Sequence, residues 1–153
     1  MIEKSGVHEK GTIKLVDIIE SAKSSRSSHK AGAIALFIGV VRGETEDQKV
    51  TSLELEAYKE KANAVLEGIC GDLREKEGIV DVQIHHFVGK FEVGDDLLYV
   101  LVSGAHRSSV FPTLQEAVER YKKEVPIFKK ESIVDDEGKK RSYWVSEQEK
   151  FTR

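Results

Sequence analysis

Hydrophobic residues recur at the spacing of an amphipathic helix in three segments of the chain, and we expect a helix in each. The first segment covers residues 15–22 and ends in a polar run. The second covers residues 59–76 and carries Cys70 on its apolar face. The third covers residues 110–121, with Ser108 and Ser109 before it as candidate N-caps. Pro112 fits this third helix only if it lies in the first turn.

Other segments have the patterns of β-strands. Residues 32–41 form a short apolar run typical of a buried strand, and residues 51–58 alternate between apolar and polar side chains. We expect these two segments to pair as a hairpin. A Gly-Asp-Asp turn at residues 94–96 predicts a second antiparallel pair. The remaining strand segments are 80–86, 97–103, 126–134 and 141–145.

The order of these elements is α-β-β-α-β-β-α-β-β, which predicts an α+β domain built on antiparallel sheets with about three helices packed on them. A chain of 153 residues is one ordinary domain, and it can bury about two-thirds of its surface. The first ten residues have no clear pattern, and we expect a loose tail there.

Composition excludes several classes of protein. The net charge is −3, which argues against non-specific nucleic-acid binding, and no apolar run is long enough to span a membrane. A polar N-terminus does not resemble a signal peptide, so we expect a cytoplasmic protein. The single cysteine, Cys70, excludes an intramolecular disulfide and a cysteine-cluster metal site.

Most candidate functional residues lie in the last third of the chain. Residues 105–153 carry 11 basic and 9 acidic side chains, whereas residues 1–104 carry 13 and 18. His106, Arg107 and the two following serines stand between a strand and a helix, where backbone amides, hydroxyls, a guanidinium and an imidazole together suit a phosphate. The competing interpretation is a simple helix cap with solvated neighbours.

Three further cations are candidates. Lys122 lies near the end of the third helix and Lys129 follows Pro126, so the reversal of the chain can bring both ammonium groups to one pocket. Arg42 follows the buried run and is placed to reach an anion, or to form a surface ion pair. Pattern alone favours solvated lysines.

In the stretches that contain these candidate residues, the sequence resembles the large, catalytic subunit of molybdopterin synthase. The resemblance covers roughly residues 31–146, and it implies a fold like the α/β-hammerhead and a division into an N-terminal tail and helix of uncertain role (1–30) and a synthase domain (31–153) within one domain overall. The matching stretches are residues 32–42, 53–58, 103–109, Lys122, residues 126–131 and Trp144.

The resemblance also implies an activity and an assembly. Such subunits form a homodimer within a heterotetramer, and each binds a small ubiquitin-like subunit whose C-terminal thiocarboxylate carries sulfur. Two sulfurs pass to cyclic pyranopterin monophosphate and form the dithiolene of molybdopterin. By motif matching, Lys122 and Lys129 take the places of two essential lysines, and Arg42, His106 and Arg107 those of residues that bind the substrate phosphate. No metal or redox cofactor is implied.

The sequence departs from the family pattern at two positions. Phe87 stands where the family often has arginine, which removes or replaces one anion contact, and Phe128 stands where tryptophan is common. The alternative hypothesis is a non-catalytic module that binds a phosphate or nucleotide, or only docks a partner.

Overall fold

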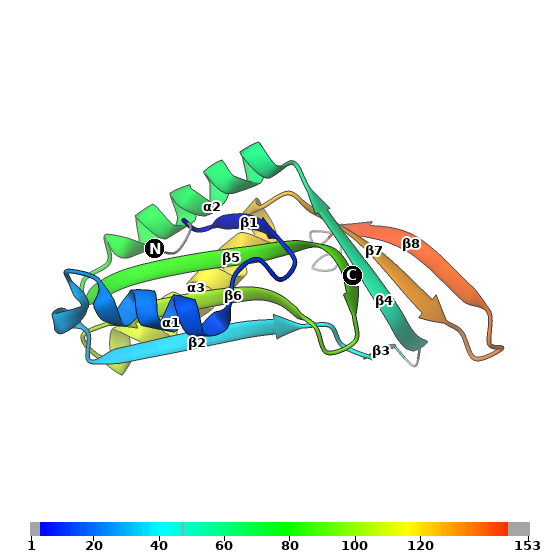
Figure 1. Cartoon of the computed structure of the whole chain (residues 1–153), viewed down its shortest axis with the longest axis horizontal. Coiled ribbons are helices and arrows are strands. Elements are labelled where there is room, and N and C mark those ends of the chain that lie inside the picture. The colour runs from blue at the N-terminus through cyan, green and yellow to red at the C-terminus, as the bar shows by residue number, and fades with distance from the viewer. Residues whose placement is uncertain (1–3, 47, 147–153) are drawn as a thin grey trace.

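The computed structural model describes residues 4–46 and 48–146, and it confirms the expected α+β class (Figure 1). The helical elements are α1 (Leu15–Ser24), the short 3-10 helix η1 (Ser28–Lys30), α2 (Lys59–Arg74) and α3 (Arg107–Glu124). The strands are β1 (Gly6–Glu9), β2 (Ala33–Val40), β3 (Glu44–Thr45), β4 (Gln48–Ala57), β5 (Ile79–Glu92), β6 (Asp96–Gly104), β7 (Ile127–Val134) and β8 (Lys140–Ser146).

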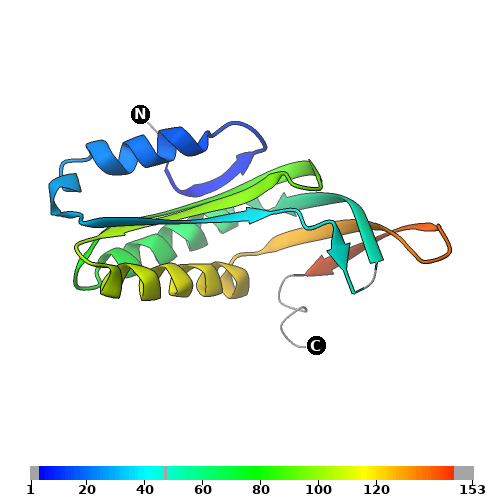
Figure 2. The same cartoon turned by 90° about the horizontal axis from the view of Figure 1, so that it is seen from below.

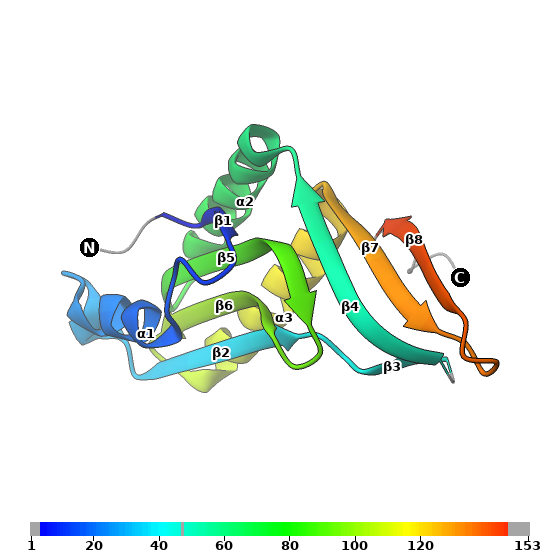
Figure 3. The ribbon, with the colours of Figure 1, turned by 45° about the vertical axis from the view of Figure 1, so that its right-hand side comes forward.

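The strands form one strongly bent sheet in the order β2-β6-β5-β4-β7-β8, with β1 added beside β5 and β3 beside β4. The pairing of β5 with β6 is antiparallel, as predicted. The predicted hairpin of β2 with β4 is wrong, because β2 pairs with β6, while β4 pairs with β5 and β7. The long strand β5 connects β6 to β4 in the sheet, since its first part pairs with β6 and its last part pairs with β4. Strands β4, β7 and β8 therefore project from the helical body as a separate wing (Figure 3).

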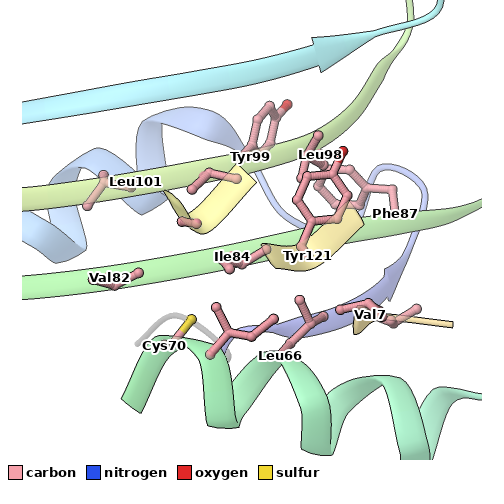
Figure 4. Close-up of a cluster of buried hydrophobic side chains, with 14 of the residues drawn as sticks. Val7, Leu66, Cys70, Val82, Ile84, Phe87, Leu98, Tyr99, Leu101 and Tyr121 are labelled. Atoms are coloured by element: carbon pink, nitrogen blue, oxygen red, sulfur yellow. The ribbon is translucent and has the colours of Figure 1, made fainter. Parts of the chain in front are cut away.

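The helices cover both faces of the main sheet. Helix α1 lies on one face, and α2 and α3 lie on the other (Figure 2). Side chains of α2, including Leu66 and Cys70, point at Val82 and Ile84 of β5, and all four are buried (Figure 4). The predicted placement of Cys70 on a buried helix face is confirmed. Within residues 4–46 and 48–146, no helix has the length and apolar character needed to cross a bilayer.

The N-terminal segment contradicts the expectation of a loose tail. Residues 6–9 form β1, which runs parallel to β5 with Val7 opposite His86 and His8 opposite Phe87. Val7 is buried in the core, and Asn63 of α2 accepts a hydrogen bond from its backbone amide at 2.7 Å. A four-residue strand is too short for its alternation to stand out from the sequence, so tertiary pairing decides its structure.

Candidate functional site

The residues expected to bind phosphate lie at the start of α3. His106 is the N-cap residue, with extended backbone angles, and the helix begins at Arg107. The first amides of a helix have no acceptor within it, and the helix dipole places partial positive charge there. The side chains of His106, Arg107 and Ser108 are all exposed, so cationic and hydroxyl groups surround a helix N-terminus that is open to solvent.

Ser108 and Ser109 are not the caps that the sequence suggested, because α3 begins earlier and both lie inside it. Pro112 consequently lies in the second turn rather than the first. Helix α3 packs closely against the end of β6. A Cβ atom on Gly104 would lie 2.5 Å from the carbonyl oxygen of Gly78 and 2.9 Å from Cγ2 of Val110, so only glycine fits here.

Lys122 lies in the last turn of α3, where its side chain is half-buried. The neighbouring Tyr121 anchors this turn, because its ring is buried and packs edge-on against His86 of β5 with centroids 5.6 Å apart. The backbone amide of Val125 bonds to the carbonyl of Tyr121 and closes the helix. Lys122 therefore extends from a fixed backbone.

Lys129 is the third residue of β7, and its side chain is only 8% exposed. It pairs with Leu55 of β4 on one side and with Val145 of β8 on the other. An ammonium group this deep in a sheet is unusual, because burial of charge costs free energy unless opposite charge is near.

Glu131 is a buried residue that the sequence analysis missed. It lies two positions after Lys129, so both side chains point to the same face of β7, and it is 6% exposed. The opposite charges of the two side chains lower the cost of burying either one. The alternation of Ile127, Lys129, Glu131 and Ile133 was the available signal, because it places two charges in an otherwise apolar row.

The candidate residues at the start of α3 lie far from Lys122 and from Arg42 within one chain. Arg107 and Lys122 are separated by most of α3, which is about 22 Å at 1.5 Å per residue. Arg42 is exposed just beyond the end of β2, whereas His106 and Arg107 lie beside the beginning of β2, where Ala33 pairs with Gly104. The length of β2 separates these two positions by about 25 Å.

The two departures from the family pattern lie in different surroundings. Phe87 is buried and packs edge-on against Tyr99 with ring centroids 5.2 Å apart, so this position belongs to the core under α1. Phe128 is exposed on β7 and packs edge-on against Tyr58 at 5.9 Å. The change at Phe128 therefore affects a surface contact.

Comparison with known proteins agrees with these features. Residues 9–124 match the family model described as MoaE protein. The chain is 39% identical over 127 residues to the molybdopterin synthase catalytic subunit of Pyrococcus abyssi, covering 83% of this chain and 82% of that protein. It also spans half the length of a Haloferax volcanii relative, named probable molybdopterin synthase, to which it is 40% identical over 135 residues, 87% of this chain.

Solved structures show the same fold. The crystal structure of molybdopterin synthase from Staphylococcus aureus aligns with a TM-score of 0.80 and 29% identity, covering 95% of this chain and 98% of that one. A more distant fold neighbour is a complex of subunits 1 and 2 of molybdopterin-converting factor from Helicobacter pylori, with a TM-score of 0.67, 17% identity and 82% of each chain covered. The chain described here belongs to the MoaE family, the family of the molybdopterin synthase catalytic subunits.

Proposed function

We propose that this protein is the catalytic subunit of a molybdopterin synthase and acts as a sulfurtransferase. Its sulfur donor is the thiocarboxylated C-terminus of a small ubiquitin-like subunit, and its acceptor is cyclic pyranopterin monophosphate. Each transfer breaks the C–S bond of one thiocarboxylate and forms a C–S bond on a side-chain carbon of the pterin, where a C–O bond breaks and its oxygen leaves. Water supplies the oxygen that returns the donor to a carboxylate, and two transfers complete the dithiolene.

The observation that carries this proposal is the pair of lysines, half-buried Lys122 and buried Lys129, in a chain of this family. Acyl-group chemistry needs a proton donor or acceptor at the reacting atoms and positive charge where anionic intermediates develop. We assign acid–base work, or a transient covalent link to the donor, to Lys122. Lys129 supplies fixed positive charge, because it is held within the sheet beside Glu131.

The phosphate of the substrate is assigned to the cations at the start of α3. Arg107 offers a guanidinium fork, His106 an imidazole, and the helix N-terminus its amides, which together make a strong anion site. Arg42 lies about 25 Å from this group within one chain, so in the proposal it completes the group from the second copy of the homodimer. No protein thiol is needed, because sulfur arrives on the donor subunit.

The proposed assembly is a homodimer within a heterotetramer, with one small subunit on each catalytic subunit. The separation of the candidate residues supports the homodimer, since a bound molecule as small as a pterin does not span about 22 Å. The complex of two subunits in the Helicobacter pylori neighbour supports a small-subunit partner.

A reconstituted reaction tests the proposal. Purified protein is mixed with a thiocarboxylated small subunit and cyclic pyranopterin monophosphate, and the dithiolene product is followed by its fluorescence after oxidation. We expect product only when both partners are present. Replacing Lys122 with alanine is expected to lower turnover by about 10²- to 10⁴-fold, the usual contribution of a general acid or base.

Lys123→Ala is the matched control, because Lys123 is the next residue of the same helical turn and its side chain is exposed. It should keep turnover within a few-fold of the unmodified protein. Normal turnover of the Lys122 variant would refute the role assigned to Lys122. No product from folded protein and charged donor would favour a phosphate-binding or docking module instead.

A further inference from the structure

A tight turn joins β5 to β6 beside the end of β2, and it holds the backbone next to Arg42 (Figure 3). The amide of Val41 donates to the carbonyl of Asp95 at 3.0 Å, and the amide of Gly94 donates to the carbonyl of Val41 at 2.9 Å. The side chain of Val41 is buried in the core. Both polar backbone groups of the residue before Arg42 are therefore bound to one turn.

The residue after Arg42 lies against the same turn. A Cβ atom on Gly43 would lie 3.1 Å from Cγ1 of Val93, and the carbonyl of Gly43 accepts a hydrogen bond from the amide of Val50 at 2.9 Å. The side chain of Arg42 is exposed. Its guanidinium thus extends from a short segment that is fixed at both ends, and the position of residues 93–95 determines where that segment lies.

The turn depends on two of its own residues. Gly94 has a φ of 91°, a backbone conformation that other residues rarely adopt. Oδ2 of Asp95 accepts a hydrogen bond from the amide of Glu92 at 2.8 Å, and the amide of Asp95 donates to the carbonyl of Glu92 at 3.0 Å. Asp95 therefore closes the turn with both its backbone and its side chain.

Lys10 binds this turn from the N-terminal segment. Its ammonium nitrogen lies 2.6 Å from Oδ2 of Asp95 and 5.5 Å from the centre of the Phe91 ring. The amide of Lys10 donates to the carbonyl of Val88 at 3.0 Å, so this lysine extends from backbone that is itself attached to β5. The hydrogen bond from the ammonium group is the main reason that the pKa of Asp95 lies below its ordinary value, and the carboxylate is charged at neutral pH.

We propose that Lys10 is a positioning residue for Arg42, and that its ion pair with Asp95 fixes the turn that holds Arg42 in place. The proposal rests on the proposed function, because Arg42 is assigned there to the substrate phosphate. It gives the N-terminal segment a role in substrate binding, which the resemblance leaves unassigned. Arg42 is the group that touches the substrate, and Lys10 acts on it through residues 93–95 and Val41.

Amide hydrogen exchange, followed by NMR, tests the structural part without any substrate. In Lys10→Ala the amide of Val41 is expected to exchange about two- to five-fold faster, which is the factor that a partly exposed ion pair contributes. Asp95→Ala also removes the bond to Glu92 and should accelerate this exchange further. Lys10→Arg keeps the charge and should behave as the unmodified protein does. Lys14→Ala is the matched control, because Lys14 is an exposed lysine of the same segment. Unchanged exchange at Val41 in Lys10→Ala would overturn the proposal.

Substrate affinity tests the consequence for binding. Calorimetric titration with cyclic pyranopterin monophosphate measures the dissociation constant, which should rise about two- to five-fold in Lys10→Ala and stay unchanged in Lys14→Ala. Arg42→Ala removes the group that is positioned, so adding Lys10→Ala to it should not change the dissociation constant further. An equal effect of Lys10→Ala with and without Arg42 would show that the lysine acts by another route, and this result would overturn the proposal.

Turnover separates this proposal from the proposed function. In the reconstituted reaction, Lys10→Ala should raise KM for the pterin by the same factor and leave kcat within about two-fold, because it removes binding and not chemistry. A variant that had only lost folded protein would show the opposite, a lower kcat with an unchanged KM. An unmodified protein that neither binds nor converts the pterin would refute the proposed function. Full turnover of the unmodified protein, with an unchanged KM in Lys10→Ala, would refute the positioning role alone.

Discussion

The two faces of the β5–β6 sheet are built from different chemistry. The face towards α2 and α3 is apolar over its centre, where Val82 and Ile84 meet Leu66 of α2 (Figure 4). The other face, on which α1 lies, carries a row of polar side chains on β5. This row consists of Asp81, Gln83 and His85, which alternate with the apolar residues on the same strand.

A continuous chain of hydrogen bonds connects the polar side chains on this face. Arg74 donates to Asp81 at 3.1 Å, and the amide nitrogen of Gln83 donates to the same carboxylate at 2.9 Å. The amide oxygen of Gln83 lies 3.0 Å from Nε2 of His85, so that nitrogen carries the hydrogen. Nδ1 of His85 then accepts from Nε2 of His8 at 3.0 Å. The chain joins α2, β5 and β1, and it depends on protonation in a way that the apolar face does not.

We expect the largest loss of stability from a substitution on the apolar face. Leu66 is fully buried, so Leu66→Ala removes its contacts and leaves a cavity, and we expect the free energy of unfolding to fall by about 4 kcal/mol. Urea denaturation at pH 7 and at pH 5 measures this loss, which should be equal at the two values. Glu67→Ala, on the exposed side of the same helix, should cost less than about 0.5 kcal/mol. A loss below about 1 kcal/mol for Leu66→Ala would contradict the packing described here.

Acid is expected to lower the free energy of unfolding through a group on the polar face. Burial, together with the charge of neighbouring His8, lowers the pKa of His85 from 6.5 to about 4. Between these pH values the unfolded chain binds a proton that the folded protein does not, so stability is complete above pH 6.5 and falls as the pH drops towards 4. The expected loss from this group is about 3 kcal/mol.

Denaturation curves between pH 4 and pH 7 measure this effect. A His85→Gln variant lacks the titrating group and should lose less stability across the same range, whereas Leu66→Ala should keep the full pH dependence. Equal slopes for His85→Gln and the unmodified protein would show that His85 is not the responsible group.

Gln83 connects the two halves of the hydrogen-bonded chain, and its replacement should have a smaller effect. Gln83→Ala leaves Asp81 and His85 each without one buried partner, which should cost about 2 kcal/mol at pH 7. Gln83→Glu sharpens the comparison, because a carboxylate beside His85 stabilises the protonated ring and raises its pKa. The acid-induced loss should therefore shrink in Gln83→Glu when it is measured by the same denaturation curves. An unchanged acid-induced loss would contradict the contact between residues 83 and 85.

Local patterns predicted the elements on the apolar face more completely than those on the polar face. The helical spacing around Leu66 and Cys70 gave the boundaries of α2 to within two residues, because one side of that helix packs on an apolar layer. His85 and His86 are adjacent in β5, so the alternation of a strand places their side chains on opposite faces, where they contact His8 and Tyr121 respectively. Their partners were not predictable, since they come from segments distant in sequence.

Pairing between distant strands and the shape of the site also lay beyond local patterns. Strand β1 has four residues, and its pairing with β5 joins positions 79 residues apart, such as Gly6 and His85. The candidate residues Arg42, Lys122 and Arg107 were identified by type and motif, but their separation depends on the lengths of β2 and α3 as assembled. Spacing along the sequence could not show how far apart they lie.

The smallest effect is expected at Cys70, where the apolar and polar regions meet. Its side chain is fully buried on α2, and its sulfur lies 3.7 Å from the hydroxyl of Ser5. Burial raises the pKa of the Cys70 thiol, so the thiol stays protonated near neutral pH and is a poor nucleophile. Cys70→Ala should cost about 1 kcal/mol of stability through lost packing. Turnover in the reconstituted reaction should be unchanged, because the donor subunit carries the sulfur; a ten-fold loss in a folded variant would place a protein thiol in the transfer and would require a different mechanism.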